Sequence, residues 1–161
     1  MAIDVVWALA GIFCAVVLAG IGSARGVGLA GQAAAGGMSE TPQNFGKYLI
    51  LVALPGTQGI YGFAIAFLFF LRLNAVKFML APGTGLYFLL GSLPVALGGL
   101  VSGIFQGMTC ASAIMMTGKQ PKESTKGLIF AVIIEFYAIL GFVISFFVWL
   151  WLLQSDAILP K

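Results

Sequence analysis

Glu135 is an acidic residue in the middle of a long apolar run, a position where a carboxyl group can bind a cation or a proton. The other acids, Asp4, Glu40, Glu123 and Asp156, stand near the ends of apolar runs or in the polar segments between them. Glu135 follows Lys126 by nine residues, which places it about 14 Å further along a helix, near the midplane of a bilayer. A charged carboxylate at that depth costs at least a few kcal/mol, so such acids are generally functional. The alternative is a protonated structural carboxyl that hydrogen-bonds a neighbouring helix.

Other polar side chains lie at a similar depth in their own apolar runs, namely Thr57, Gln58 and Gln106. Tyr61 follows Thr57 by four residues and therefore shares its helix face. A lone polar residue in lipid usually joins two helices by a hydrogen bond. Their shared depth with Glu135 favours a common site instead. Carboxylate, hydroxyl and amide oxygens are hard ligands, which suit Na⁺ better than a soft metal.

Pro55 predicts a break in the second apolar run. Proline has no backbone N–H, so the carbonyl of Leu51 loses its helical partner. We expect a kink around Leu54-Pro55-Gly56, which leaves backbone carbonyls available as ligands.

The composition predicts an all-α membrane protein with four transmembrane helices. Hydrophobic residues make up 61% of the 161 residues and charged residues only 8%, whereas soluble domains carry roughly a quarter. The apolar runs cover about 3–36, 48–71, 85–117 and 127–153, and each exceeds the roughly 20 residues that span a bilayer. They form two helical hairpins, 1–73 and 85–161, joined by a connector at 74–84. No basic cluster alternates with exposed aromatics, which argues against a nucleic-acid partner.

Two polar turns, at 38–46 and 118–125, close the hairpins, and four spans place both termini opposite them. Lys47, Lys119, Lys122 and Lys126 flank the turns, against Arg72, Lys77 and Lys161 on the other side. This excess favours cytoplasmic turns.

The chain also contains an internal repeat. The segment Ile60–Phe67 matches Ile139–Phe146 at an offset of 79 residues. The odd spans match less well, at an offset of 81, through the glycine pairs Gly22/Gly103 and Gly26/Gly107. In this alignment Glu135 pairs with Gly56 and Gln106 pairs with Arg25, so the first hairpin lacks the carboxylate. Arg25 has three interpretations: it reaches water by snorkelling, lines the lumen of a ring, or pairs with Glu135.

Small residues recur every four positions in the odd spans, as in Gly99, Gly103 and Gly107. Such stripes let helices approach closely in lipid. They fit equally a monomeric bundle and the crowded inner wall of a ring of copies.

The motifs Leu54-Pro55-Gly56-Thr57-Gln58-Gly59 and Glu135-Phe136-Tyr137-Ala138-Ile139-Leu140-Gly141-Phe142 resemble the proteolipid ring subunits of V-type ATPases, in particular the bacterial sodium-pumping form. Ile21-Gly22-Ser23-Ala24-Arg25-Gly26-Val27-Gly28 and Tyr61-Gly62-Phe63 add to the resemblance, which covers essentially the whole chain. Where the family commonly has Lys in the first helix, this chain has Arg25.

The resemblance implies a rotor ring of about ten copies in lipid, turned by ATP hydrolysis elsewhere, with a chain that is not itself catalytic. It implies that Glu135, Gln106, Gln58, Thr57 and the carbonyl of Leu54 bind Na⁺, and that Tyr61 hydrogen-bonds the carboxylate. It also implies a stator subunit with an essential arginine and a central-stalk subunit at the polar turns.

Three alternatives remain open on the sequence alone. The same rotor could carry H⁺, which requires only a carboxyl in an apolar pocket. A small multidrug/proton antiporter also has four spans and one membrane Glu, but it places the acid in the first span and lacks the repeat. The third alternative is a structural four-span protein without a transport role.

Overall fold

The computed structural model describes residues 2–155 and 158–159, so Asp156 and Lys161 lie outside the described residues. The elements are α1 (Ala2–Glu40), η1 (Pro42–Asn44), α2 (Phe45–Ala53), η2 (Leu54–Gly56), α3 (Thr57–Ala75), α4 (Gly85–Lys119), η3 (Pro121–Glu123) and α5 (Ser124–Gln154). Over these described ranges the chain is helical without strands, which confirms the all-α fold class.

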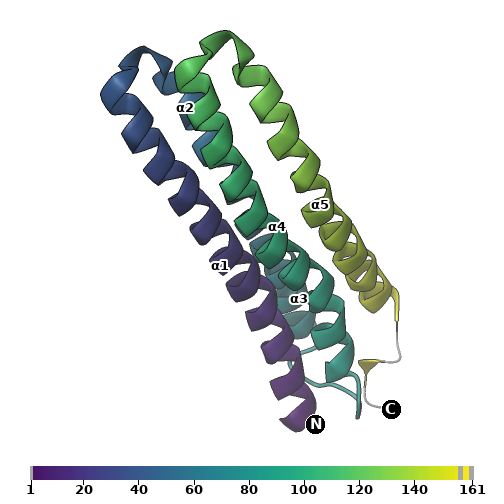
Figure 1. The fold of residues 1–161 in the computed structure, drawn as a ribbon. Coiled ribbons are helices and arrows are strands. Elements are labelled where there is room, and N and C mark those ends of the chain that lie inside the picture. Colours follow the sequence, from purple (N-terminus) through teal and green to yellow (C-terminus); the bar gives the residue numbers. More distant parts are fainter. Residues whose placement is uncertain (1, 156–157, 160–161) are drawn as a thin grey trace.

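The helices form four spans long and apolar enough to cross a membrane: Ala2–Glu40, Pro42–Ala75, Gly85–Lys119 and Pro121–Gln154. The start of α1 and the end of α5 lie at one end of the bundle and the two turns at the other (Figure 1). Large apolar side chains such as Phe63, Phe136 and Leu140 are exposed, as expected of surfaces that face lipid or other apolar partners. The chain is an integral, multi-pass membrane protein.

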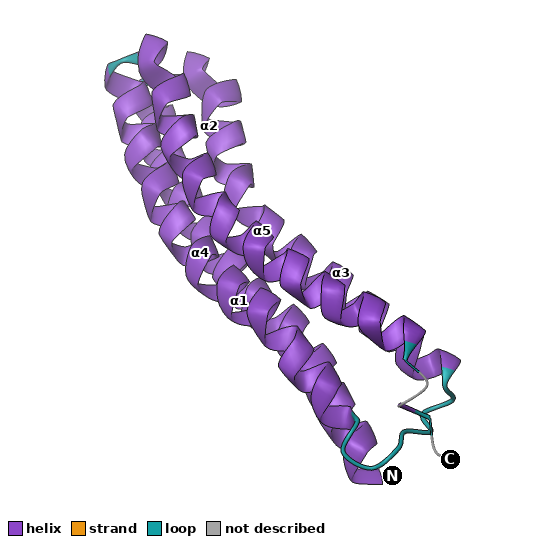
Figure 2. Ribbon diagram, turned by 90° about the vertical axis from the view of Figure 1, so that its right-hand side faces the viewer, coloured by secondary structure: helices purple, strands orange, loops and turns teal. Residues whose placement is uncertain are grey.

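Helices α1 and α4 pack backbone to backbone along their glycine stripes. A Cβ atom on Gly103 would lie 2.7 Å from the carbonyl carbon of Gly22, and one on Gly99 would lie 2.8 Å from the Cβ of Ala19. These approaches leave no room for side chains at the contact. The stripes therefore hold the two hairpins of one chain together, with α3 and α5 on the other side of this pair (Figure 2).

Hydrogen bonds fasten the hairpins at both ends. At the turn end, Lys47 Nζ donates to the carbonyl of Pro121 at 2.6 Å. At the other end, Arg72 Nε donates to the carbonyl of Leu152 at 2.9 Å, and Asp4 accepts the N–H of Gly83 at 2.6 Å. The middle of the bundle, where Glu135 lies, thus has hydrogen bonds between spans on either side of it along the helix axes.

The packing corrects the register of the internal repeat. A Cβ on Gly62 would meet the carbonyl oxygen of Ala15, and one on Gly141 would meet that of Pro94. Gly141 follows Gly62 by 79 residues, and Pro94 follows Ala15 by the same number, so the odd spans share the offset of the even spans, and the offset of 81 was wrong. Glycines spaced by four match themselves at several shifts, so a stripe alone does not fix register.

With the corrected register the counterpart of Gln106 is Val27, not Arg25. Val27 Cγ2 lies 3.8 Å from a Cβ position on Gly56, the counterpart of Glu135. The first hairpin therefore lacks both the carboxylate and its nearest amide.

The α1–α4 contact generates a stability prediction. Gly103→Ala places a methyl group against the backbone of Gly22, so we expect the free energy of unfolding to fall by about 1–3 kcal/mol. Unfolding in mixed micelles of rising SDS content measures the change. Gly46→Ala is the control, because a Cβ there meets nothing within 4 Å; equal effects of both changes would contradict the close contact.

Candidate cation site

The Glu135 carboxylate lies between α5, α3 and α4 and accepts hydrogen bonds from four side chains. Oε1 accepts the hydroxyls of Thr57 at 2.5 Å and Tyr61 at 2.8 Å. Oε2 accepts the amide Nε2 atoms of Gln106 at 2.7 Å and Gln58 at 3.4 Å. Glu135 is only 8% exposed. Hydrogen bonds to an ionised carboxylate stabilise its charge, so this shell compensates for the loss of water.

The two glutamines form the inner wall of the site and are fully buried. Gln58 Nε2 donates to Gln106 Oε1 at 2.6 Å, and Gln106 Nε2 also donates to the carbonyl of Ala131 at 3.0 Å. Gln58 Oε1 is buried and lacks a hydrogen-bond partner. A buried amide oxygen without a partner is unfavourable, and a cation is one group that would satisfy it.

The break at η2 places Thr57 and Gln58 at the first turn of α3, opposite Glu135. Helix α2 ends at Ala53, residues Leu54–Gly56 form a 3₁₀ turn around Pro55, and α3 begins at Thr57, as the proline predicted. The Leu54 carbonyl accepts the hydroxyl of Thr57 at 3.0 Å. The Thr57 hydroxyl has a single proton, which it shares between this carbonyl and Glu135, and the carbonyl also accepts the backbone N–H of Thr57.

The oxygen atoms at this site suit a small monovalent cation. Hydroxyl, amide, backbone carbonyl and carboxylate oxygens are hard ligands. Within the described ranges no three His, Cys, Asp or Glu residues come together as a metal cluster. One carboxylate with one monovalent cation is neutral, whereas a divalent cation would leave a net charge in lipid.

All six residues expected at the site lie within one hydrogen-bonded group: Leu54, Thr57, Gln58, Tyr61, Gln106 and Glu135. Arg25 is exposed on α1, and the groups donating to Glu135 are uncharged, so the interpretation as an ion pair with Glu135 was wrong. Ser23 was not singled out by the sequence, yet its hydroxyl bonds the backbone at Pro55, within the break, and at Gly59, just after it. Its burial on the glycine face of α1 was the available signal.

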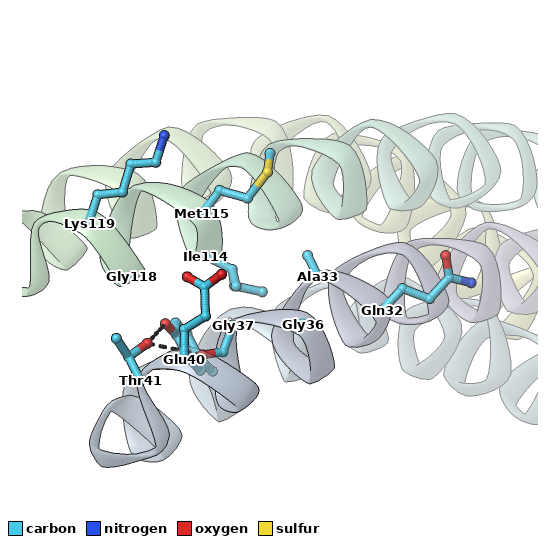
Figure 3. A pocket seen from close by; sticks show the side chains of 11 residues that line it. Gln32, Ala33, Gly36, Gly37, Glu40, Thr41, Ile114, Met115, Gly118 and Lys119 are labelled. Carbon is cyan, nitrogen blue, oxygen red and sulfur yellow. Dashed lines mark hydrogen bonds between the residues drawn. The ribbon is translucent and has the colours of Figure 1, made fainter.

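A second hollow lies between the two turns, lined by residues of α1 and α4 that include Gln32, Gly36, Glu40, Met115 and Lys119. The Glu40 carboxylate points from α1 toward α4, while the Lys119 side chain points away from the Glu40 carboxylate (Figure 3). This hollow is open and lies at the turn end of the bundle, separate from Glu135.

Fold and site together define a class: a small multi-pass membrane protein of two packed helical hairpins that carries a carboxylate, Glu135, in an uncharged polar shell in the middle of its last span. The family model for the C subunit of ATP synthase matches residues 10–69 and 89–148, again 79 residues apart. The chain belongs to this family of ATP synthase C subunits. This membership argues against the antiporter and the purely structural alternative.

Two relatives are similar over most of the chain. The V-type sodium ATPase subunit K of Enterococcus hirae is 51% identical over 141 residues, which cover 88% of this chain and 88% of the relative. The A-type ATP synthase subunit K of Methanocaldococcus jannaschii is 38% identical over 148 residues, covering 89% of this chain and 63% of the relative.

The shell around Glu135 generates a second stability prediction. Gln106→Leu removes the amide that donates to Glu135 and to Ala131, so we expect a loss of about 1–3 kcal/mol in the free energy of unfolding. The same SDS titration measures it. Gln120→Leu, at an exposed position just beyond α4, should change stability by less than about 0.5 kcal/mol; a Gln106→Leu variant as stable as this control would contradict the network.

Proposed function

We propose that this chain is the membrane rotor subunit of a V-type rotary ATPase and carries one Na⁺ per copy at Glu135. The observation that carries the proposal is the convergence of uncharged hydroxyl and amide groups from two hairpins on the buried Glu135 carboxylate. The name of the Enterococcus hirae relative, a sodium ATPase subunit, agrees with it.

In this proposal Na⁺ is the cargo, and its ligands are Glu135, Thr57, Gln58, Gln106 and the carbonyl of Leu54. A carboxylate alone would suffice for a proton, whereas the unpartnered oxygen of Gln58 is a group that a metal cation uses. Tyr61 donates to the carboxylate and holds its orientation. Bound Na⁺ neutralises Glu135, so the loaded site can pass through lipid.

Rotation follows from this neutrality. ATP hydrolysis in a soluble part of the complex turns the assembled copies, and the chain itself hydrolyses nothing. At a stator subunit, a fixed arginine displaces the cation from Glu135 into an aqueous path, since the ionised carboxylate then has a positive partner.

Assembly into a head-to-tail ring is supported by a vacant groove on the second hairpin. The groove is lined by Gly98, Val101, Ser102, Phe105, Ile134 and Tyr137. Their counterparts 79 residues earlier are Ala19, Gly22, Ser23, Gly26, Pro55 and Gln58. Those counterparts form the surface on which α4 packs within the chain, through Gly99 and Gly103.

Repeating this packing from copy to copy would seat α1 of the next copy in the vacant groove. Within the chain, Gly26 contacts Gly103. The counterpart of Gly26 is Phe105 and that of Gly103 is Ala24, so the equivalent contact between copies joins Phe105 to Ala24 of the next copy. Val101, Phe105 and Tyr137 are 52%, 57% and 66% exposed in the isolated chain, and the next copy would cover them. A contact between two different surfaces closes into a ring when the rotation permits, and the resemblance implies about ten copies.

The two polar turns are the proposed cytoplasmic contact with a central-stalk subunit. Lys47, Lys119, Lys122 and Lys126 gather at this end, as the positive-inside rule expects of a cytoplasmic face. The hollow is open at this end, and Glu40 and Lys119, which border it, are both exposed to a partner. The termini then lie on the opposite side of the membrane.

The cation assignment is tested by labelling Glu135 with a carbodiimide, which reacts with a protonated carboxyl. We expect millimolar Na⁺ to slow the labelling of the assembled protein, because a bound cation excludes the proton. Glu135→Gln is the control and should not label. Labelling indifferent to Na⁺ at every pH would reject Na⁺ and leave H⁺ as the cargo.

The ring is tested by cysteine cross-linking in a background with Cys14→Ala and Cys110→Ala. The double variant Ala24→Cys with Phe105→Cys should form a ladder of covalent oligomers in the membrane, because each residue faces a different neighbour. Either substitution alone should stay monomeric. Dimers from a single substitution, or monomers from the double variant, would contradict head-to-tail assembly.

A further inference from the structure

Ser23 on α1 bonds the backbone inside the break of the second span, at Pro55, and just after it, at Gly59. Its hydroxyl donates to the carbonyl of Pro55 at 2.5 Å and accepts the N–H of Gly59 at 3.2 Å. In an uninterrupted α-helix the N–H of Gly59 would donate directly to the carbonyl of Pro55, four residues earlier. Here one oxygen of another helix binds both groups. Ser23 is only 7% exposed, so water does not readily replace it.

The segment between these two bonds carries the site. Thr57 and Gln58 lie between Pro55 and Gly59, and both bond Glu135. The Leu54 carbonyl lies just before it and bonds the Thr57 hydroxyl. Ser23 is not one of the four residues that donate to Glu135. It is linked to Glu135 only through the segment 55–59. The Ser23 hydroxyl therefore fixes the backbone of the segment that carries three of the proposed ligands, Leu54, Thr57 and Gln58.

The second hairpin contains a natural comparison. Ser102 is the counterpart of Ser23 at an offset of 79, but its hydroxyl donates to the carbonyl of Gly98 in its own helix at 2.6 Å. The counterpart of Pro55 is Ile134, and α5 is continuous from Ser124 to Gln154. In the second hairpin, where α5 is unbroken, the equivalent serine bonds within its own helix. The cross-helix bonds of Ser23 thus accompany the break and are not a general property of this position.

We propose that Ser23 is a positioning residue for the cation site: it holds the helix open between Pro55 and Gly59 so that Thr57, Gln58 and the Leu54 carbonyl face Glu135. This inference rests on the proposed function and deepens it. Residues behind the direct ligands typically change metal affinity when they are removed, because the ligands lose their preset orientation.

The test is the Na⁺ concentration that halves carbodiimide labelling of Glu135 in the assembled protein. For Ser23→Ala we expect this concentration to rise about tenfold, while the labelling rate without Na⁺ stays near that of the wild type. The unchanged rate shows that the carboxyl group remains in place and accessible. Ser92→Ala is the matched control, because Ser92 is also buried on a central helix but bonds only the carbonyl of Phe88 in its own helix.

A double variant separates positioning from simple loss of packing. Pro55→Ala restores the backbone N–H that bonds the Leu51 carbonyl in a regular helix. The helix can then continue through residue 59, so Ser23 has no break to hold. If Ser23 acts through the break, Ser23→Ala should raise the half-protecting Na⁺ concentration much less in the Pro55→Ala background than in the wild type. Equal shifts in both backgrounds would overturn the proposal.

The outcomes for the wild type and the variants are distinguishable. Wild-type labelling that ignores Na⁺ would reject the sodium site and with it this role of Ser23. Wild-type protection with an unchanged half-protecting concentration in Ser23→Ala would reject the role of Ser23 alone. A Ser23→Ala variant that also loses labelling without Na⁺, or loses its assembly, would assign Ser23 a structural role instead.

Discussion

The cost of an ionised carboxylate in hydrocarbon is the constraint on which the rest of the structure depends. Glu135 lies in the middle of α5, an almost entirely apolar helix. A charge there requires compensating donors or a counter-ion. The structure provides donors from two other spans, and each is uncharged. A shell of this kind holds the carboxylate without a permanent ion pair, so a cation can still be bound and released.

The break at Pro55 supplies what a continuous helix cannot. In an intact helix each interior carbonyl accepts the N–H four residues later and points along the helix axis, whereas the Leu54 carbonyl at the break bonds both the N–H and the hydroxyl of Thr57. The 3₁₀ turn at Leu54–Gly56 brings a carbonyl, a hydroxyl and an amide together within five residues. Broken backbone at membrane depth is tolerated only where protein groups satisfy it, and Ser23 and Thr57 do so here.

Duplication explains why the hairpins differ in role. The first hairpin keeps the break and loses the carboxylate at Gly56, whereas the second keeps Glu135 and has an unbroken outer helix. The site forms only where the first hairpin packs on the second. At the proposed contact between copies, the counterparts of Thr57, Gln58 and Tyr61 are Phe136, Tyr137 and Leu140, which would face Gly56 of the next copy. That contact has no carboxylate, so each copy carries one site.

Much of this arrangement could be predicted from the sequence, because the strongest signals are local. A lone acid at membrane depth, a proline in a span and polar residues at matching depth each have a direct physical meaning. Register between the odd spans could not be predicted, since glycines every four residues align at several offsets and only contacts such as Gly62 with Ala15 discriminate. Ser23 was missed for a related reason. A serine in a stripe of small residues resembles a packing residue, and its bonds depend on how two segments meet in space, since Ser23 and Pro55 are 32 residues apart in sequence. The proposed ligands are thus readable from their chemistry, whereas the contacts of Ser23, the proposed positioning residue, are visible only once the helices are packed.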